Sequence, residues 1–233
     1  MGHSLDLQGV EFLTFDCYGT LIDWETGIFE ALHPILVAHG HKLERVALLE
    51  RYGAFEAEVE SGSYLIYRDV LRKVVDRFGD SFGFEPTKEE CDRFAASVAD
   101  WPAFPDSRDA LERLAAKFKL VVLSNVDDDL FEGSNRKLGS PFYAVFTAKQ
   151  IGSYKPNSRN FRFAIERLGG DVHRILHVAQ SLYHDIKPAR EIGLRTVWIN
   201  RRAGQEGGGA TPAVEARPDA VFATLAEFSD AVG

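Results

Sequence analysis

The chain has 233 residues and a formal net charge of −8, with 45% hydrophobic and 27% charged residues. This composition is typical of a globular protein, and the length fits one large domain or a core with an inserted subdomain. The acidic balance argues against a general nucleic-acid-binding surface. No apolar stretch approaches the roughly 18 residues of a membrane helix, and the N-terminus has no signal-peptide core. We therefore expect a cytoplasmic protein that binds neither nucleic acid nor membrane.

The first predicted strand, Val10–Phe15, is the most informative segment of the chain. Its apolar run ends in Asp16, and Gly19 with Thr20 predicts a turn immediately afterwards. Ligands bind at the carboxyl ends of the strands in open α/β sheets. A carboxylate held there close to a cation can act as a nucleophile and form an ester with the substrate. Asp16 is therefore the candidate nucleophile.

A long helical segment follows this strand. About a hundred residues separate the first strand from the second, too many for one crossover helix. Several amphipathic patterns and no convincing strand occur in this stretch. They predict a helical cap over the carboxyl edge of the sheet, formed by residues 23–100. Residues 1–22 and 101–233 are then expected to form the core.

The second half of the chain alternates strands with helices. Further short apolar runs predict strands at Leu120–Ser124, Ala144–Thr147, Ile175–Val178, Thr196–Ile199 and Asp219–Phe222. Helical spacing of apolar residues precedes the runs that begin at Leu120, Ile175 and Thr196. Such alternation predicts an α/β fold with a parallel, Rossmann-like sheet covered by helices on both faces. The glycine-rich stretch Ala203–Thr211 predicts a surface loop, and Leu225–Val232 a closing helix.

Polar residues lie at or near the predicted carboxyl ends of several strands. In chain order they are Asp16, Tyr18 and Thr20; Ser124 and Asn125; Lys155; and the segment from Ser181 to Asp185. Together they supply a nucleophile, hydroxyl and amide donors, a fixed cation and a second carboxylate. Each of these signals is weak alone, because a strand-end aspartate or Ser-Asn pair often caps a turn. Their common position on one sheet edge predicts an active site.

These segments carry a family resemblance. The runs Phe15–Leu21, Leu123–Asn125 and Tyr154–Pro156, followed by the late Asp185, resemble in order the four motifs of the haloacid dehalogenase-like hydrolases. The resemblance spans residues 10 to 200 and implies that family's fold with an inserted helical cap. Within it, the opening Asp-x-Tyr-Gly-Thr is similar to that of the L-2-haloacid dehalogenases.

Tyr18 is the residue that separates two chemistries. In the family's phosphatases, an acid at this position protonates a departing alkoxide, which is worth roughly 10²–10⁴ in rate. A halide leaves without a proton and needs only electrostatic and hydrogen-bonding stabilisation. The phenol of Tyr18 titrates near about 10 and is a poor proton donor at neutral pH. The sequence thus favours displacement of halide from carbon by Asp16.

The resemblance also assigns roles to the other residues. It implies that Arg51, in a segment similar to the dehalogenases' catalytic arginine segment, and Asn125 hold the departing halide. Ser124, with backbone N–H groups near Cys17 and Tyr18, is expected to bind the substrate carboxylate.

The remaining predicted site residues act on the nucleophile or shape the pocket. Thr20 and Lys155 are expected to keep Asp16 ionised, because an adjacent cation favours a carboxylate. Asp185 is expected to orient the hydrolytic water, and Ser181 belongs to the same segment. Tyr18, Tyr52 and Phe55 are expected to line an apolar substrate pocket, although a packing role in the cap is equally compatible with Tyr52 and Phe55.

Two positions depart from the dehalogenase pattern. Phe161 stands where a tyrosine is expected six residues after the motif lysine. The segment Ser181–Asp185 lacks the expected asparagine and instead carries His184 beside the acid. This histidine is predicted to contact the substrate or the water, or else to cap a helix.

The predicted function is hydrolysis of a small 2-haloalkanoic acid to the 2-hydroxy acid, without metal or cofactor. The expected partners are the haloacid and halide ion, and the apolar faces of the cap helices are compatible with a homodimer. Two alternatives stay open. A Mg²⁺-dependent phosphatase of the same family shares Asp16, Ser124, Lys155 and Asp185, and a non-catalytic binding protein can keep the fold alone.

Overall fold

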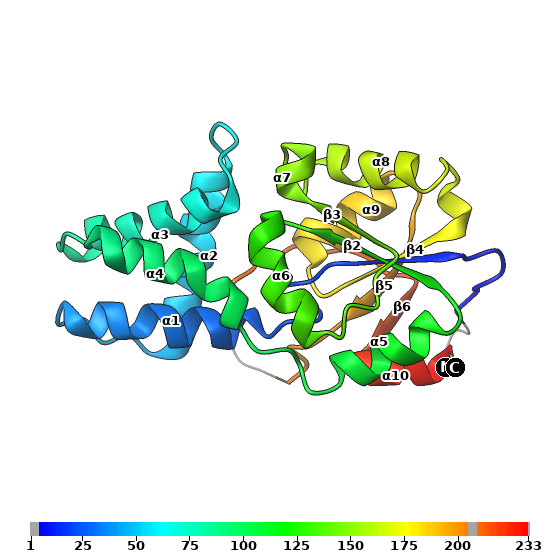
Figure 1. Ribbon diagram of the computed structural model, residues 1–233, viewed down its shortest axis with the longest axis horizontal. Helices are drawn as coiled ribbons and strands as arrows, with labels where there is room; N and C mark the ends of the chain where they lie inside the picture. The colour runs from blue at the N-terminus through cyan, green and yellow to red at the C-terminus, as the bar shows by residue number, and fades with distance from the viewer. Residues whose placement is uncertain (1–4, 205–208, 233) are drawn as a thin grey trace.

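A computed structural model describes residues 5–204 and 209–232. The predicted α/β fold is confirmed: six parallel strands form one sheet in the order β3-β2-β1-β4-β5-β6 (Figure 1). The strands are β1 (Phe12–Phe15), β2 (Lys119–Ser124), β3 (Ala144–Thr147), β4 (Ile175–Ala179), β5 (Arg195–Ile199) and β6 (Ala220–Phe222). The central strands β1, β2 and β4 are buried on both sides, which explains their nearly continuous apolar sequences.

Helices cover both faces of this sheet. One face carries α7 (Ala148–Ile151), α8 (Ser158–Arg167) and α9 (Lys187–Glu191), and the other carries α5 (Ser107–Ala115), α6 (Asp128–Lys137) and α10 (Leu225–Ala231). The strand order reverses between β1 and β4, where the chain crosses from one half of the sheet to the other. Ligands bind outside such a switch point in open sheets, so Asp16 lies at the expected place.

Most sequence predictions of strand position are accurate to within one or two residues. The largest difference is at the start of β1, which begins at Phe12 instead of Val10. The backbone of Val10 closes a turn by donating its N–H to Leu7, so it cannot join the ladder. Part of the predicted surface loop Ala203–Thr211, residues 205–208, lies outside the described residues.

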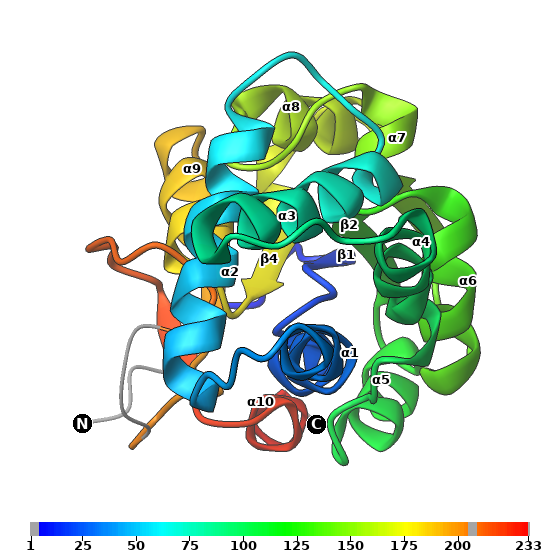
Figure 2. The same ribbon diagram turned by 90° about the vertical axis from the view of Figure 1, so that its left-hand side faces the viewer.

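Four helices between β1 and β2 make up the segment predicted as a cap. They are α1 (Trp24–Ala38), α2 (Arg45–Glu60), α3 (Tyr67–Phe82) and α4 (Lys88–Ala96), and a 3₁₀ turn, Ser97–Asp100, follows. Asp23 caps α1, while Thr87 and Glu90 form a reciprocal capping box on α4. These helices lie beside the end of the sheet at which β1 ends, as Figures 1 and 2 show together. We call α1 to α4 the cap helices.

Backbone contacts fix the cap helices against the core. The Asp127 carboxylate accepts the N–H groups of Tyr67 and Arg68 at the start of α3, both at 2.9 Å. A second approach involves Gly53 of α2, where an added Cβ would lie 2.4 Å from the carbonyl oxygen of Ala210. Only glycine permits this packing without a shift of the backbone. The space between α2, α3 and the sheet edge is therefore defined by the core itself.

Within residues 5–204 and 209–232, every helix is too short or too polar to cross a membrane.

Candidate active site

Asp16 follows β1 directly, and the chain turns at once behind it. Gly19 has a φ of +94°, a left-handed conformation that favours glycine. The turn returns the hydroxyl of Thr20 to the carboxylate, where Oγ1 donates to Asp16 Oδ2 at 2.7 Å. The same hydroxyl oxygen accepts the backbone N–H of Gln180 at 2.8 Å, which ties β1 to the end of β4. The predicted contact between Thr20 and the nucleophile is therefore present.

Lys155 is the central cation of the site. Its side chain is 1% exposed, and Nζ donates to Asp16 Oδ1 at 2.9 Å, to Asp185 Oδ1 at 2.6 Å and to the carbonyl of Leu123 at 2.9 Å. Burial opposes its charge, but the two carboxylates outweigh this and raise the pKa of Lys155. Burial raises the pKa of Asp16, and the charge of Lys155 opposes that shift. One cation thus holds both carboxylates at the sheet edge.

A buried chain of hydrogen bonds links Asp185 through His177 to Thr14. His177 Nε2 lies 2.9 Å from Asp185 Oδ1, and His177 Nδ1 lies 2.9 Å from Thr14 Oγ1. Burial raises the pKa of Asp185, but the charge of Lys155 and the hydrogen bonds from His177 and Lys155 lower it by more, so the net shift is downward. Asp185 Oδ2 has no hydrogen-bond partner among the described residues. The sequence gives no sign of this role of His177, because the residue stands inside the apolar run of β4, where a packing role in the core is expected.

Ser124 and Asn125 follow β2 and serve different purposes. The amide of Asn125 forms two hydrogen bonds with the backbone of Lys155, at 2.8 and 3.0 Å, and so fixes the position of the lysine. Ser124 is 2% exposed, and its hydroxyl oxygen has no hydrogen-bond partner in the described part of the chain. A buried hydroxyl without a partner costs free energy unless a ligand satisfies it. Ser124 is therefore free to bind substrate.

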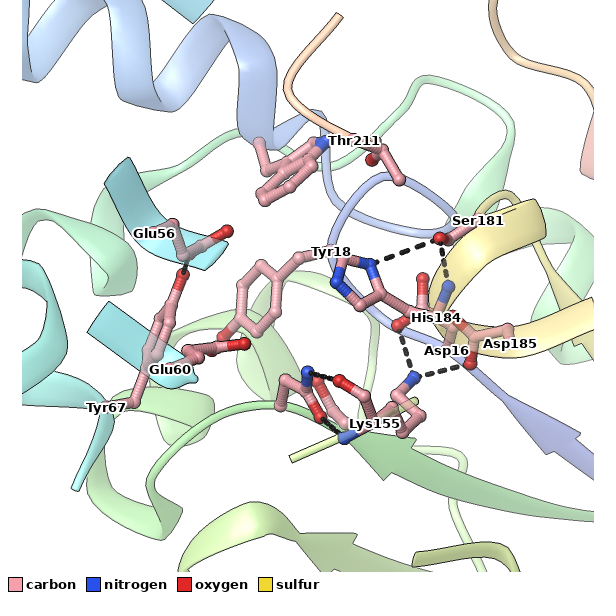
Figure 3. A pocket seen from close by; sticks show the side chains of 13 residues that line it. Asp16, Tyr18, Glu56, Glu60, Tyr67, Lys155, Ser181, His184, Asp185 and Thr211 are labelled. Carbon is pink, nitrogen blue, oxygen red and sulfur yellow. Dashed lines mark hydrogen bonds and ion pairs between the residues drawn. The ribbon is translucent and has the colours of Figure 1, made fainter. Parts of the chain in front are cut away.

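The segment Ser181–Asp185 begins a π-helical turn that runs through Leu182–Ile186. The hydroxyl of Ser181 caps this turn by accepting the N–H of His184 at 2.8 Å, and it also contacts His184 Nδ1 at 3.2 Å. Burial lowers the pKa of His184 to about 4, so its imidazole is neutral at neutral pH. Ser181 acts here mainly by orienting His184 towards the pocket (Figure 3).

Tyr18 lines the pocket with its ring and is held by contacts behind it. Its hydroxyl lies 3.1 Å from Ser134 Oγ, and its ring packs edge-on against Trp101. Burial raises the pKa of Tyr18 well above its usual value, which makes the phenol an even poorer acid. The side chain of the neighbouring Cys17 is fully buried and does not line the pocket, so only its backbone adjoins the site.

The cap residues predicted from sequence are placed differently. Arg51 is exposed, and its guanidinium lies over the ring of Phe82, 5.1 Å from the centroid, instead of in the pocket. Tyr52 is fully buried, with its hydroxyl bonded to Glu56 and Tyr67, and Phe55 packs edge-on against Phe78. Arg51 therefore lies outside the pocket, where the resemblance does not place it, and Tyr52 and Phe55 take the packing role in the cap that the sequence also allows.

The face of α2 turned to the site carries acids instead. Glu56 and Glu60 line the pocket with Tyr67 of α3, opposite Asp16 and Lys155 (Figure 3). Burial raises the pKa of Glu56 to about 7, against the hydrogen bonds from Tyr52 and Tyr67. Burial also raises the pKa of Glu60, and the negative charge of Glu56 adds to that effect. Sequence analysis missed both acids, although their spacing of four residues places them on one helix face.

The pocket between the core and the cap helices has about 440 Å³ of empty space, part of which is open to solvent. It is lined by Asp16, Tyr18, Trp24, Glu56, Glu60, Tyr67, Ser124, Asn125, Lys155, Ser181, His184, Asp185 and Thr211. A second and more open cavity adjoins it and shares Glu60, Lys155 and His184 with it. Such a pocket is suited to a small substrate that enters past Glu60.

Among the described residues, no three His, Cys, Asp or Glu side chains are grouped so as to hold a metal ion. Both carboxylate oxygens of Asp16 accept hydrogen bonds, from Lys155 and from Thr20. Asp185 Oδ1 accepts from Lys155 and lies 2.9 Å from His177 Nε2, whereas Asp185 Oδ2 has no partner among the described residues.

A family model of haloacid dehalogenase-like hydrolases matches residues 10–193. The chain belongs to this family. The match includes the strand that ends at Asp16 and the segments that carry Ser124, Lys155 and Asp185. The matched part of this hydrolase thus contains the sheet-edge aspartate and the buried lysine.

Curated relatives of this hydrolase include two kinds of enzyme. An (S)-2-haloacid dehalogenase of Pseudomonas fluorescens is 26% identical over 239 residues, which cover 96% of this chain and 97% of the relative. The 5-amino-6-(5-phospho-D-ribitylamino)uracil phosphatase YigB of Escherichia coli strain K12 is 30% identical over 220 residues, with 85% and 87% covered.

Solved structures show the same fold. The L-2-haloacid dehalogenase PA0810 superposes with a TM-score of 0.79 at 22% identity, covering 96% of this hydrolase and 99% of that chain. The L-2-haloacid dehalogenase of Xanthobacter autotrophicus superposes with a TM-score of 0.78 at 20% identity, covering 96% and 98%. At this level of identity, the likeness shows the fold alone.

Proposed function

We propose that this hydrolase removes halide from a small 2-halo acid and releases the 2-hydroxy acid through an ester on Asp16. The observation that carries the proposal is the contact of Asp16 with Lys155, at 2.9 Å, beside a tyrosine instead of an acid. This arrangement supplies an ionised nucleophile but no proton for a poor leaving group. The names of the haloacid dehalogenase relatives support the same reaction.

In the first step, a carboxylate oxygen of Asp16 attacks C2 of the substrate from behind the carbon–halogen bond. An ester C–O bond forms, the carbon–halogen bond breaks, and halide leaves with the electron pair. The substrate carboxylate binds the unpaired hydroxyl of Ser124 and the backbone N–H groups near Cys17 and Tyr18. Asn125 gives one amide hydrogen to the Lys155 carbonyl and has a second for the halide. Arg51 takes no part because it lies outside the pocket.

In the second step, water attacks the ester carbonyl of Asp16. Asp185 has one oxygen fixed by Lys155 and His177 and a second without a partner, which suits it to hold this water. Asp185 accepts one proton of this water and passes it to the alkoxide oxygen as the bond between that oxygen and the Asp16 carbonyl carbon breaks. The product leaves as a 2-hydroxy acid, and the second proton of the water goes to solvent. Lys155 stabilises the negative charge that develops on the carbonyl oxygen. The Asp16 carboxylate is then regenerated for the next turnover.

Measurement of chloride release from (S)-2-chloropropionate in EDTA tests the proposal. We expect chloride and (R)-lactate in equal amounts, because attack from behind inverts C2. A parallel incubation with p-nitrophenyl phosphate and Mg²⁺ tests the phosphatase reaction, for which Tyr18 is unsuited. Phosphate release without chloride release would contradict the proposal.

A single turnover in ¹⁸O-labelled water tests the intermediate. With excess enzyme, the label is expected in the Asp16 carboxylate and not in the first lactate released. Mass spectrometry of the peptide that contains Asp16 locates the label. Label that appears directly in lactate would mean that water attacks C2 and that Asp16 forms no ester.

A further inference from the structure

Two carboxylates in the cap face the reacting end of the site across the pocket. Glu56 and Glu60 stand four residues apart on α2, and both line the pocket together with Asp16 (Figure 3). Glu56 is only 6% exposed. Helix surfaces rarely bury acidic residues unless a partner compensates the charge. The cap therefore places an unusual acidic wall opposite Asp16.

Hydrogen bonds fix Glu56 but leave it without a cation. Tyr52 and Tyr67 donate their hydroxyls to Glu56 Oε1 at 2.7 and 2.8 Å. Glu56 Oε2 forms no hydrogen bond with the described residues. Glu60 likewise forms neither a hydrogen bond nor an ion pair within the described part of the chain. The oxygens that remain are available to a ligand in the pocket.

The protein itself does not supply a counter-ion for these acids. Lys155 is the one cationic side chain among the described residues that line the pocket, because His184 is neutral at neutral pH. Its ammonium is already shared by Asp16 and Asp185. The positive charge of Lys155 also reaches Glu60, but burial outweighs it there. Burial therefore raises the pKa of both acids, and a cationic ligand would supply the counter-charge that favours their carboxylates.

Aromatic rings surround the same part of the pocket. Trp24, which is 8% exposed, lines it from α1, and Tyr18 and Tyr67 line it from the turn after β1 and from α3. Aromatic faces attract ammonium groups through the ring quadrupole, by about 0.5–2 kcal/mol depending on desolvation. Carboxylates together with aromatic rings are the combination that recognises alkylammonium ions.

The other end of the pocket points independently to an anionic group. Ser124 Oγ is buried without a partner beside Asp16, where hydroxyl and backbone N–H donors suit a carboxylate. The pocket therefore has a donor end at Ser124 and an acidic, aromatic end at Glu56 and Glu60. A substrate with a carboxylate at one end and a cation at the other matches both.

We propose that the preferred substrate is a zwitterionic 2-halo acid, whose substituent beyond C2 carries an ammonium group bound by Glu56, Glu60 and the surrounding aromatic rings. This inference rests on the proposed function for its reacting carbon and names the substrate class of the same site. An ammonium group between the two acids removes their mutual repulsion. A plain 2-haloalkanoate would instead place its alkyl group against two carboxylates.

Two matched substrates test the inference. (S)-4-amino-2-chlorobutanoate carries an ammonium where (S)-2-chloropentanoate carries a methyl group of similar size. Chloride release gives kcat/KM for each, and we expect the ammonium substrate to be favoured on the order of tenfold. A ratio of one or less in the unaltered protein would overturn the inference.

Substitutions on α2 locate the origin of the preference. Glu60→Gln and Glu56→Gln each remove a negative charge and keep the shape of the side chain. In either variant we expect kcat/KM for the ammonium substrate to differ by less than about twofold from kcat/KM for (S)-2-chloropentanoate. Glutamine at position 56 still accepts the hydroxyls of Tyr52 and Tyr67. Glu58→Gln is the matched control, because Glu58 lies on the exposed side of α2 and pairs with Arg77. A preference that survives both pocket substitutions would contradict the assignment.

Product binding separates this inference from the proposed function. Calorimetry on the unaltered chain compares 4-amino-2-hydroxybutanoate with 2-hydroxypentanoate and needs no turnover. Preferential binding of the ammonium product, lost in Glu60→Gln, supports the inference even if no chloro acid releases chloride. Chloride release from (S)-2-chloropentanoate with no ammonium preference in turnover or binding supports the dehalogenase reaction and overturns the inference.

Discussion

The core wall and the cap wall of the pocket differ in whether their carboxylates are paired with a cation. On the core wall, Lys155 pairs with Asp16 and Asp185, and His177 braces Asp185 from behind. On the cap wall, Glu56 and Glu60 face the pocket, and the described cap residues that line it include no cation. The carboxylates of the core wall thus pair with a cation of the protein itself, whereas those of the cap wall do not. In the proposed reaction, the core wall carries the chemistry and the cap wall selects the substrate.

The two walls also come from different parts of the fold. Asp16, Ser124, Lys155 and Asp185 follow strands of the sheet, whereas Glu56 and Glu60 stand on the inserted helix α2. The family model spans both parts, because it matches residues 10–193. Changes on the two walls should therefore affect different measurements.

Asp16→Asn is expected to have the largest effect, because it removes the nucleophile from the core wall. Activity should fall on the order of 10⁴-fold or more, as for other catalytic nucleophiles. Asparagine keeps the shape, and its Oδ1 still accepts from Lys155, whereas its Nδ2 cannot accept the Thr20 hydroxyl, so the unfolding midpoint should change far less than the activity. Chloride release and urea unfolding measure the two effects, and a mass spectrum of the variant excludes reversion by deamidation. Activity within tenfold of the unaltered protein would remove Asp16 as nucleophile.

Glu56→Gln is expected to have an intermediate effect that depends on pH. Because the pKa of Glu56 is raised from 4.5 to about 7 in the folded chain, its stabilising contribution is complete below pH 4.5 and is lost as pH rises through about 7. That difference corresponds to roughly 3 kcal/mol at 1.36 kcal/mol per unit. The variant should therefore gain stability relative to the unaltered protein between pH 4.5 and 7.

Urea unfolding at several pH values measures this gain. The groups that face Glu56 are Tyr52 and Glu60 of α2 and Tyr67 of α3, with Lys155 across the pocket. Glu58→Gln is the control for the same change of residue type on the exposed side of α2. A difference between Glu56→Gln and the unaltered protein that stays constant from pH 4.5 to 7 would mean that Glu56 ionises normally in the folded chain.

Arg51→Ala is expected to have the smallest effect. The guanidinium lies over Phe82 on the exposed side of the cap, so its loss should cost at most about 1 kcal/mol of stability. The kcat/KM for 2-chloropropionate should change less than about twofold, because no step of the proposed reaction uses Arg51. A loss of 100-fold or more would show that the cap rearranges to bring Arg51 to the halide.

The sequence predicts the core well because of two simple regularities. Apolar runs predict strands, and parallel strands bring their carboxyl ends to one edge. These rules alone bring Asp16, Ser124, Lys155 and Asp185 together, and the structure places all four around one pocket. His177 could not be predicted in this way, because nothing in the sequence of an apolar strand indicates that its one histidine contacts Asp185.

The cap is harder to predict because its inner face is not uniformly apolar. The spacing Val46-Leu49-Tyr52-Phe55 predicts one buried stripe on α2, yet the buried residues are Leu48, Leu49, Tyr52, Gly53 and Glu56. Val46 is 43% exposed. A helix that lines a polar pocket buries acids and glycine, so hydrophobic periodicity finds Leu49 and Tyr52 but gives no signal for Glu56 and Glu60. Arg51 is misplaced for another reason, because its predicted role rests on a short resemblance and not on the pattern of the helix.

Two hydrogen bonds join the core wall to the cap at the start of α3. Asp127, which is 1% exposed, follows Ser124 and Asn125 closely in the chain and holds the first N–H groups of α3. The loop that carries the unpaired Ser124 hydroxyl therefore also holds the start of the helix that carries Tyr67. A movement of α3 away from the sheet would break both of these hydrogen bonds, so it would be coupled to the loop that follows β2.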